Sequence, residues 1–275
     1  MLTLTSLHIY PIKSIGGIAL EEARLEPRGF QYDRRWMLVD ADGRFVSQRE
    51  IAGLATLGTA LEPPFLTVFL KKNPAQRIQI PLEPDLPAMP ETEVQIWDDR
   101  CPARVHDATV NRWFSDRFGQ ALRLVYMPDS THRPTNPKYV ADTPVSFADG
   151  YPYLIIGQAA LDALNRRMDN PLPMNRFRPN LVFSGGTPHE EDGWEEFRIG
   201  AQLFQGVKPC VRCIIPTTDQ DTGLRGAEPL KTLAHYRQVD RKILFGLNVT
   251  WLGAETGWLR LGDRIEVLSK KNLKI

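Results

Sequence analysis

The chain alternates apolar and polar residues in short segments, which is the pattern of β-strands. Leu2 and Leu4 alternate with threonines, and Leu7 and Ile9 continue the alternation in the opposite phase. Because successive strand side chains point to opposite faces, this change of phase predicts a bulge between the two pairs. The 20 glycines and 22 prolines separate such segments throughout, so the pattern predicts a mainly β chain.

A β-hairpin is predicted around Asp42-Gly43. The apolar run 35–39 leads into this pair, and 44–47 leads out of it. An Asp-Gly pair tolerates the positive φ that a tight hairpin turn needs. The other segments predicted to be strands, each between turn signals, are 65–70, 77–80, 94–97, 122–126, 181–183, 214–217 and 264–268.

Helical patterns occur in three segments. Asp107 is predicted to cap a helix over 108–118, whose apolar residues fall on one face. The segment 158–168 is rich in strong helix formers, and 229–236 begins with a proline, which the first helical turn accepts. The predicted fold class is therefore mainly β with a few helices.

A domain boundary is predicted in the stretch 127–145, which is polar and contains prolines. We expect a first domain over residues 1–127 and a second over 128–275. A chain of 275 residues is long enough to bury one large core or two smaller ones, so two domains are feasible.

The charge balance disfavours several classes of function. The chain has 34 Lys and Arg against 33 Asp and Glu, and 42% of it is hydrophobic, as in ordinary soluble proteins. A dedicated nucleic-acid binder would need basic clusters to neutralise phosphates, so no nucleic acid is expected. No stretch approaches the roughly 18 apolar residues of a membrane span. The first residues also lack the features of a signal peptide, and we expect a cytoplasmic protein.

Three cysteines carry the sharpest chemical signal: Cys101, Cys210 and Cys213. Three thiols cannot supply an all-cysteine iron–sulfur cluster, so electrons would come from a partner or from another cofactor. The last two form a C-x-x-C pair without the second ligand pair of a structural zinc site, and 214–217 predicts a strand instead of a thioredoxin-like helix. Two interpretations stay open. The pair is either two reduced thiols near a core, or a thiolate beside Arg212 that binds an anion or a soft metal.

Cations gather at two turns in the first half of the sequence. Lys13 and Ser14 lie in a glycine-containing loop after the first strand, a composition that can hold a phosphate. Arg34 and Arg35 begin the hairpin strand, where one should point inward and the other outward. Exposed charges at strand ends are common, so each segment alone also fits a solvated loop.

The second half contributes two polar loops. Arg178 precedes Pro179, which is expected to hold it extended, and with Asn180 it could read a phosphate and a polar ring edge. Residues 146–150 offer a hydroxyl, a carboxylate and a flexible glycine. Taken singly, both segments also fit loops without a function.

The histidines and tryptophans point to packing. The five histidines show no metal-ligand spacing. Trp36, Trp97 and Trp113 fall on regular strand or helix positions, so the core is favoured over a stacking platform. No nucleophile elbow, P-loop or dinucleotide fingerprint is present in the sequence.

Five segments in register resemble the MOSC-domain proteins that have an N-terminal β-barrel, a family that includes the mitochondrial amidoxime-reducing component and its bacterial relatives. The segments are YPIKS at 10–14, DRRWMLVDADG at 33–43, VQIWDDRCPARVHD at 94–107, FRPNLVFSGG at 177–186 and CVRCIIPTTDQDTG at 210–223. The resemblance implies two β-barrel-like domains, the MOSC N-terminal barrel and the MOSC barrel. It also implies a molybdenum cofactor of the molybdopterin type in the cleft between them.

Carried over position by position, the resemblance implies that Cys213 is the catalytic residue and the molybdenum ligand. Cys210 matches a cysteine that is common in relatives but is not the ligand. Several cations converging on one phosphate and on the metal would balance an anion that the near-neutral chain could not otherwise hold. The implied cofactor-binding residues are Lys13, Ser14, Arg34, Ser146, Asp149, Gly150, Arg178, Asn180 and Arg212.

The activity implied is that of an oxidoreductase that reduces N-hydroxylated compounds, such as amidoximes and hydroxylamines. Some bacterial relatives carry a C-terminal ferredoxin domain, which this sequence ends without. A separate electron-donor protein of ferredoxin or flavoprotein type is therefore expected. The family is also commonly described as binding pyridoxal phosphate, but no lysine here has an evident Schiff-base context.

Two other classes of function stay open. In the first, the protein is a molybdenum-cofactor carrier or a sulfur carrier, in which Cys210 or Cys213 bears a persulfide. In the second, it is a noncatalytic interaction protein whose site has lost its function.

Overall fold

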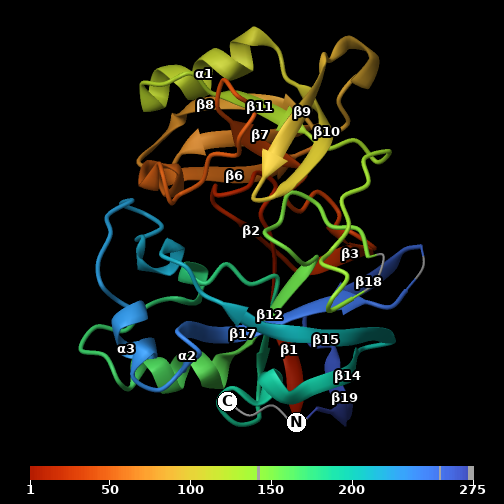
Figure 1. Cartoon of the computed structure of the whole chain (residues 1–275), viewed down its shortest axis with the longest axis vertical. Helices are drawn as coiled ribbons and strands as arrows, with labels where there is room; N and C mark the ends of the chain where they lie inside the picture. The colour runs from red at the N-terminus through yellow and green to blue at the C-terminus, as the bar shows by residue number, and fades with distance from the viewer. Residues whose placement is uncertain (141–142, 254, 272–275) are drawn as a thin grey trace.

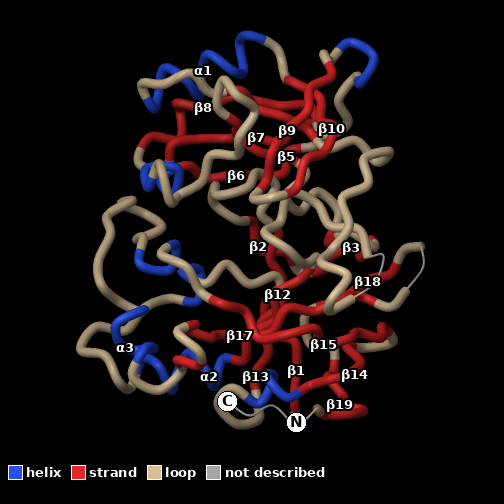
Figure 2. Tube along the Cα trace, in the orientation of Figure 1, coloured by secondary structure: helices blue, strands red, loops and turns tan. Residues whose placement is uncertain are grey.

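In the computed structural model, which describes residues 1–140, 143–253 and 255–271, the chain forms two β-rich halves stacked along the long axis (Figure 1). Strands dominate both halves, and the described ranges contain three α-helices and several short 3₁₀ turns (Figure 2). The prediction of a mainly β fold with a few helices and two barrel-like parts is confirmed.

The lower half is a closed barrel. The described strands follow the order β12-β13-β1-β19-β14-β15-β17, and β17 pairs again with β12 to close the ring. A closed sheet leaves no free edge between these strands. Its strands are β1 (Leu2–Ile9), β12 (Tyr153–Gly157), β13 (Leu181–Ser184), β14 (Trp194–Ile199), β15 (Gln202–Val211), β17 (Lys242–Trp251) and β19 (Arg264–Lys270).

The first strand of the chain is part of this barrel. β1 lies between β13 and β19, with β2 (Ile18–Leu20) beside it. The register of β1 against β13 shifts between Leu4 and Ser6, so the predicted bulge is confirmed. The division into domains 1–127 and 128–275 stays a prediction. Residues 272–275 of the predicted second domain lie outside the described residues.

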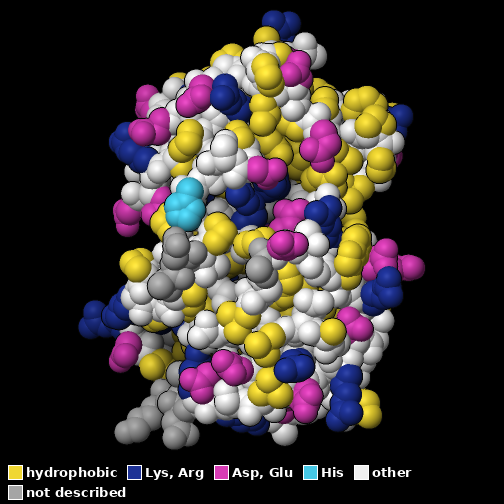
Figure 3. Space-filling model, turned by 90° about the vertical axis from the view of Figure 1, so that its right-hand side faces the viewer, with side chains coloured by type: hydrophobic (Ala, Val, Ile, Leu, Met, Phe, Trp, Pro, Cys, Tyr) yellow, Lys and Arg dark blue, Asp and Glu magenta, His cyan; other side chains and the backbone are white. Residues whose placement is uncertain are grey.

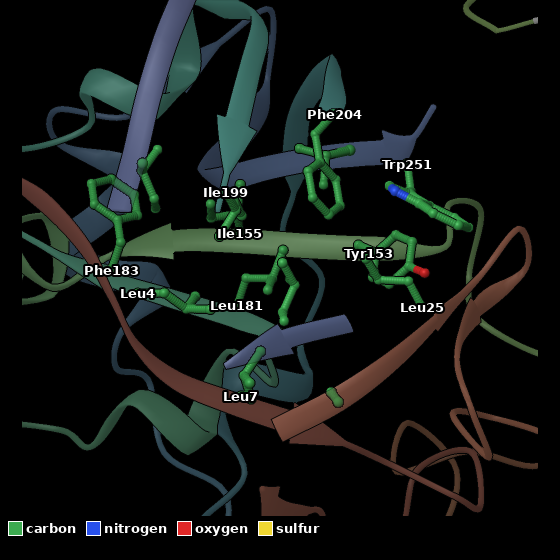
Figure 4. Close-up of a cluster of buried hydrophobic side chains, with 14 of the residues drawn as sticks. Leu4, Leu7, Leu25, Tyr153, Ile155, Leu181, Phe183, Ile199, Phe204 and Trp251 are labelled. Carbon is green, nitrogen blue, oxygen red and sulfur yellow. The ribbon is translucent and has the colours of Figure 1, made fainter. Parts of the chain in front are cut away.

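The barrel core is built from the inward side chains of both ends of the chain. Leu4 and Leu7 of β1 pack with Tyr153, Phe183 and Phe204 from the later strands (Figure 4). All five are almost fully buried. At about 25 cal/mol for each Å² of apolar surface buried, side chains of this size dominate the stability of the barrel.

The upper half contains two sheets covered by a helix. One sheet has the order β5-β11-β10-β9, and the other has the order β6-β7-β8. The helix α1 (Ala108–Phe118) packs its apolar face on them. The strands are β5 (Trp36–Val39), β6 (Leu57–Glu62), β7 (Phe65–Leu70), β8 (Asn73–Pro81), β9 (Glu91–Ile96), β10 (Asp99–Val105) and β11 (Arg123–Tyr126).

Short elements connect these parts. A small sheet, β18-β3-β4, joins a segment near the start of the chain to one near its end. The 3₁₀ turns are η1 (Ala52–Thr56), η2 (Leu86–Ala88), η3 (Met174–Arg176), η4 (Glu190–Gly193) and η5 (Ile215–Thr217). The remaining strands are β3 (Glu22–Glu26), β4 (Gly29–Phe30), β16 (Gln238–Val239) and β18 (Gly257–Arg260).

α1 and α2 begin where the sequence predicts, α3 begins one residue later, and α2 and α3 end earlier than predicted. Asp107 caps α1 by accepting hydrogen bonds from the backbone N–H groups of Thr109 and Val110. α2 (Gln158–Asn165) stops short of residue 168, because the Asn165 side chain exchanges two hydrogen bonds with the Leu172 backbone and turns the chain. α3 (Leu230–Ala234) lies inside the predicted 229–236. Within the described ranges, no helix is long and apolar enough to cross a membrane.

Two strand predictions need correction. The segment 214–217 is not a strand, because β15 ends at Val211 and Thr217 folds back to donate its hydroxyl hydrogen bond to the carbonyl of Ile214 in η5. The Asp42-Gly43 turn forms, with Gly43 at φ +79°. Its return segment 44–47 pairs with β5 only through a single bridge at Phe45.

Candidate functional site

A cavity of about 340 Å³ lies where loops of the two halves meet. All the residues predicted to form the site line it except Ser146, which is buried beneath, with its carbonyl accepting a hydrogen bond from Arg133. Basic side chains gather at the waist between the halves, interspersed with acidic ones (Figure 3). The residues that line the cavity include Lys13, Ser14, Arg34, Arg49, Trp97, Asp149, Gly150, Arg178, Asn180, Cys210, Val211, Arg212 and Cys213.

A larger cavity, of about 880 Å³, lies beside α3. None of the predicted site residues is among the described residues that line this cavity. Volume alone does not identify a site. The smaller cavity is favoured because it brings together buried charges, two thiols and strained backbone.

Lys13 and Asp149 form an ion pair inside the cavity. The Lys13 Nζ lies 2.6 Å from Asp149 Oδ1 and donates a second hydrogen bond, of 2.8 Å, to the carbonyl of Phe147. Burial lowers the pKa of Lys13 to about 8, although Asp149 opposes the shift. Lys13 and Arg49 lie beside the Asp149 carboxyl and hold its pKa well below its usual range.

Arg34 connects the two halves. Its guanidinium donates hydrogen bonds to Asp33 (2.6 Å), to the Asn180 side chain (3.0 Å) and to the Arg178 carbonyl (3.3 Å). Arg35 is buried and bonded to the Met127 carbonyl, and the Arg34 side chain is only 13% exposed, so the predicted inward and outward alternation of the two is wrong. The reason is that Arg34 has φ +49° and is not part of a strand.

Two guanidinium groups lie against the ring of Tyr10. Arg34 is 4.4 Å and Arg178 is 4.2 Å from the ring centroid, within the range of cation–π contacts. Arg178 is only 8% exposed, and its Nη1 and Nη2 have no hydrogen-bond partner among the described residues. The same holds for Nε of Arg212. Burial lowers the pKa of Arg178 to about 10. Buried donors without partners are costly, so this corner of the cavity suits an anion.

Strained backbone is concentrated around the same cavity. Of the eight non-glycine residues with positive φ in the described part of the chain, four line it: Ser14 (+68°), Arg34 (+49°), Trp97 (+55°) and Arg178 (+54°). The prediction that Arg178 is extended is therefore wrong, because its carbonyl is turned to accept the hydrogen bond from Arg34. Such conformations cost energy and cluster at functional sites.

The two thiols of the C-x-x-C pair are each contacted by a different arginine. The Nη1 of Arg212 lies 3.2 Å from the sulfur of Cys210. The Nη2 of Arg49 lies 3.2 Å from the sulfur of Cys213. The cation beside Cys213 therefore comes from the opposite half of the molecule. Cys101 is buried in the upper half, where burial raises the pKa of its thiol to about 11.

Arg49 and Trp97 are the site residues that sequence reasoning missed. Arg49 lies after a turn, in no motif, and only the fold brings it to Cys213. Trp97 was predicted to be core, yet it is 42% exposed and its ring centroid lies 4.4 Å from the Arg49 guanidinium. Trp97 is followed by Asp98, a residue common in turns, and it occupies a turn position that usually carries glycine. This is the one signal that could have shown that Trp97 lies outside the strand.

Hydrogen bonds across the halves hold Ser14 and Arg49 in place. Gln48 and Gln220 exchange two hydrogen bonds through their buried side-chain amides, and Gln48 also donates to the carbonyl of Ser14. Arg225 donates to the carbonyl of Arg49 at 2.8 Å. The segment that follows Cys213 therefore fixes the loops that face it.

Comparison with known proteins gives matches over both halves. The sequence model described as "MOSC domain" matches residues 142–266, and that described as "MOSC N-terminal beta barrel domain" matches residues 1–121. Mitochondrial amidoxime-reducing component 1 of Homo sapiens is 31% identical, with 98% of this chain and 83% of that protein covered.

Molybdenum cofactor sulfurase of Oryza sativa subsp. japonica is also 31% identical, with 95% of this chain covered. This chain spans about a third of that sulfurase, since the match covers 35% of it. Among solved structures, the YUAD protein of Bacillus subtilis matches over 96% of this chain and 94% of its own, with a TM-score of 0.42 and 9% identity.

Replacing Arg178 by methionine should stabilise the protein in the absence of anions. Arg178→Met removes two buried donors that lack partners, which we expect to raise the free energy of unfolding by about 1–3 kcal/mol. It should also abolish stabilisation by sulfate, measured by thermal unfolding with and without the salt. The control is Arg35→Met. It removes a buried arginine that has hydrogen-bond partners, so it should destabilise the protein. A loss of stability in Arg178→Met as large as in the control contradicts the argument.

Sulfate affinity should fall as the pH rises through about 8. Lys13, with a pKa lowered to about 8, is charged below that pH and neutral above it, and a bound anion favours the charged form. The dissociation constant for sulfate, measured by calorimetry from pH 6.5 to 9.5, should rise by up to about tenfold per pH unit above pH 8. Lys13→Arg should remove the dependence, since arginine stays protonated. Equal pH profiles for the two proteins would rule out Lys13 as the cause.

Proposed function

The chain belongs to the MOSC-domain family, and on this premise we propose that it binds the molybdenum cofactor in the cavity between its halves and reduces N-hydroxylated compounds. The observation that carries the proposal is that Arg178, whose Nη1 and Nη2 have no hydrogen-bond partner in the described part of the chain, lines the same cavity as Cys213. An anionic cofactor whose metal takes a thiolate would satisfy both groups at once.

The residues present fit this cofactor. Cys213 is the proposed metal ligand. Lys13, Arg34, Arg178 and Arg212 would neutralise its phosphate, with the hydroxyl of Ser14 and the amide of Asn180 as further polar contacts. Gly150 has open space where a side chain would stand, which leaves room in the loop that carries Asp149. Ser146 lies below the cavity, and we propose that it shapes this loop.

When bound, the cofactor supplies the two-electron chemistry that cleaves the N–O bond. The protein's own groups have three tasks. The cations anchor and orient the anion, and Arg49 holds the sulfur of Cys213 in position. Reduction of an N–OH group to N–H with release of water also takes up two protons. The Lys13–Asp149 pair, whose carboxylate side chain is 56% exposed, is the route we propose from solvent to the buried Nζ.

The reductase is preferred because the chain matches 83% of the length of the human amidoxime-reducing component and 35% of that of the rice sulfurase. Electrons would come from a separate protein of ferredoxin or flavoprotein type. The cytoplasmic location also stays a prediction.

Sulfur transfer is the second candidate, and the contact of both thiols with arginines favours it. A guanidinium at this distance would form a charge-assisted hydrogen bond with an anionic persulfide. Intact-protein mass spectrometry separates the candidates. The mass of one added sulfur atom on Cys210 or Cys213, without bound metal, would support the carrier.

Metal content should depend on one cysteine of the pair. We expect molybdenum in the wild type and in Cys210→Ser, and a near-complete loss in Cys213→Ser, because only the latter removes the proposed ligand. Elemental analysis together with pterin fluorescence of proteins purified from a cofactor-producing host gives the measurement. Equal loss in both variants would contradict the assignment of a single ligand.

The cofactor-loaded protein should consume amidoximes when an artificial electron donor is supplied. Loss of benzamidoxime and formation of benzamidine, followed by chromatography, measure the reaction. Cys213→Ser should lower the rate by at least about 100-fold, because the metal is no longer held. Absence of turnover with every donor tried, in a protein shown to contain the cofactor, would sink the reductase proposal.

A further inference from the structure

Trp97 occupies a position that local folding does not explain. It is the first residue of the two-residue turn between β9 and β10, with φ +55°. Hairpin turns with positive φ at this position favour glycine, and any other residue there costs free energy. Burial would offset this cost, but the Trp97 side chain stays 42% exposed. A large ring held in a strained turn, and left half in solvent, points to a role outside folding.

The contacts of the ring fix its position relative to Cys213. The guanidinium of Arg49 lies 4.4 Å from the Trp97 ring centroid, and the same guanidinium lies 3.2 Å from the sulfur of Cys213. Phe45 packs against the indole at 4.9 Å between centroids. The Arg49 guanidinium thus lies between Trp97 and the proposed metal ligand, in contact with both. Val211, another exposed apolar residue, lines the same cavity.

The indole also borders a second cavity. This cavity, of about 340 Å³, is lined by Phe45 and Val46 together with polar side chains such as Gln95 and Gln120. Trp97 lines both cavities. A molecule that reacts beside Cys213 and is too large for the first cavity would extend along this ring.

We infer that Trp97 is a specificity-determining residue, which binds the flat apolar body of a substrate whose N-hydroxylated group lies beside Cys213. The inference rests on the proposed function and deepens it, because it predicts a preference for aromatic over small aliphatic substrates. Aromatic rings gain contact energy from a neighbouring indole that a methyl group cannot match.

Benzamidoxime and acetamidoxime test this inference, because they share the N–OH group and differ only in the body attached to it. The cofactor-loaded wild type is compared with Trp97→Phe, Trp97→Leu and Trp97→Gly. In Trp97→Gly, the ratio of kcat/KM for benzamidoxime over acetamidoxime should fall about tenfold, mainly through the KM of benzamidoxime. Trp97→Phe should keep most of the ratio, and Trp97→Leu should be intermediate.

Folding does not confound the test. Glycine suits φ +55°, and the relief of strain offsets the loss of the ring's contacts with Phe45 and Arg49, so Trp97→Gly should stay folded, as thermal unfolding will show. The matched control is Trp258→Leu, because Trp258 is 51% exposed on β18 and is absent from the described lining of both cavities. Its substrate ratio should equal that of the wild type.

The outcomes separate this inference from the proposed function. An unchanged ratio in Trp97→Gly overturns the inference. An equal loss for both substrates that appears only with a protein electron donor also overturns it, and assigns Trp97 to donor docking. If neither compound is turned over, the proposed function fails. The inference is then decided by calorimetric binding of benzamidoxime, which should weaken about tenfold in Trp97→Gly and overturns the inference if it does not.

Discussion

The arrangement of the site depends on the burial of several positive charges around one cavity between two halves of the chain. Lys13, Arg34, Arg178 and Arg212 come from distant parts of the sequence and meet there. Within the protein, Asp33 and Asp149 offset part of this charge. Burial lowers the pKa of Lys13 and Arg178, a sign that the remaining charge is held at a cost in free energy. An anion that fills the cavity would remove that cost, so the same charges that weaken the free protein would tighten its complex.

The two halves act as one body because their loops bond to each other on both sides of the cavity. Arg34 reaches across to Asn180 and to the carbonyl of Arg178. Gln48 and Gln220 bond on the other side. Arg34 and Arg49 are therefore both held by contacts with the opposite half. A site built in this way requires both halves to be folded and docked, which links the integrity of the fold directly to function.

Periodicity and composition predicted most of the helices and strands, but not which of their residues form the site. The helix capped by Asp107 and the bulge in β1 follow from local rules and are confirmed. The site residues were chosen because short motifs resemble those of the MOSC-domain family. The structure brings these residues together, and their roles remain predictions. Arg49 could not be predicted, since its contact with Cys213 is purely tertiary. Trp97 was misassigned because strand alternation was extended one residue into a turn.

The place of β1 has a consequence for how the molecule is made. Its partner β19 follows every other strand of the barrel in the sequence, so the barrel cannot close until β19 has been synthesised. The upper half, inserted between β2 and β12, emerges earlier and contains all the strands of its two sheets. During synthesis it can therefore fold while β1, paired only with β2, waits for its barrel partners. A fragment that begins at β12 would present two open sheet edges, at β13 and β19, and would tend to associate through them.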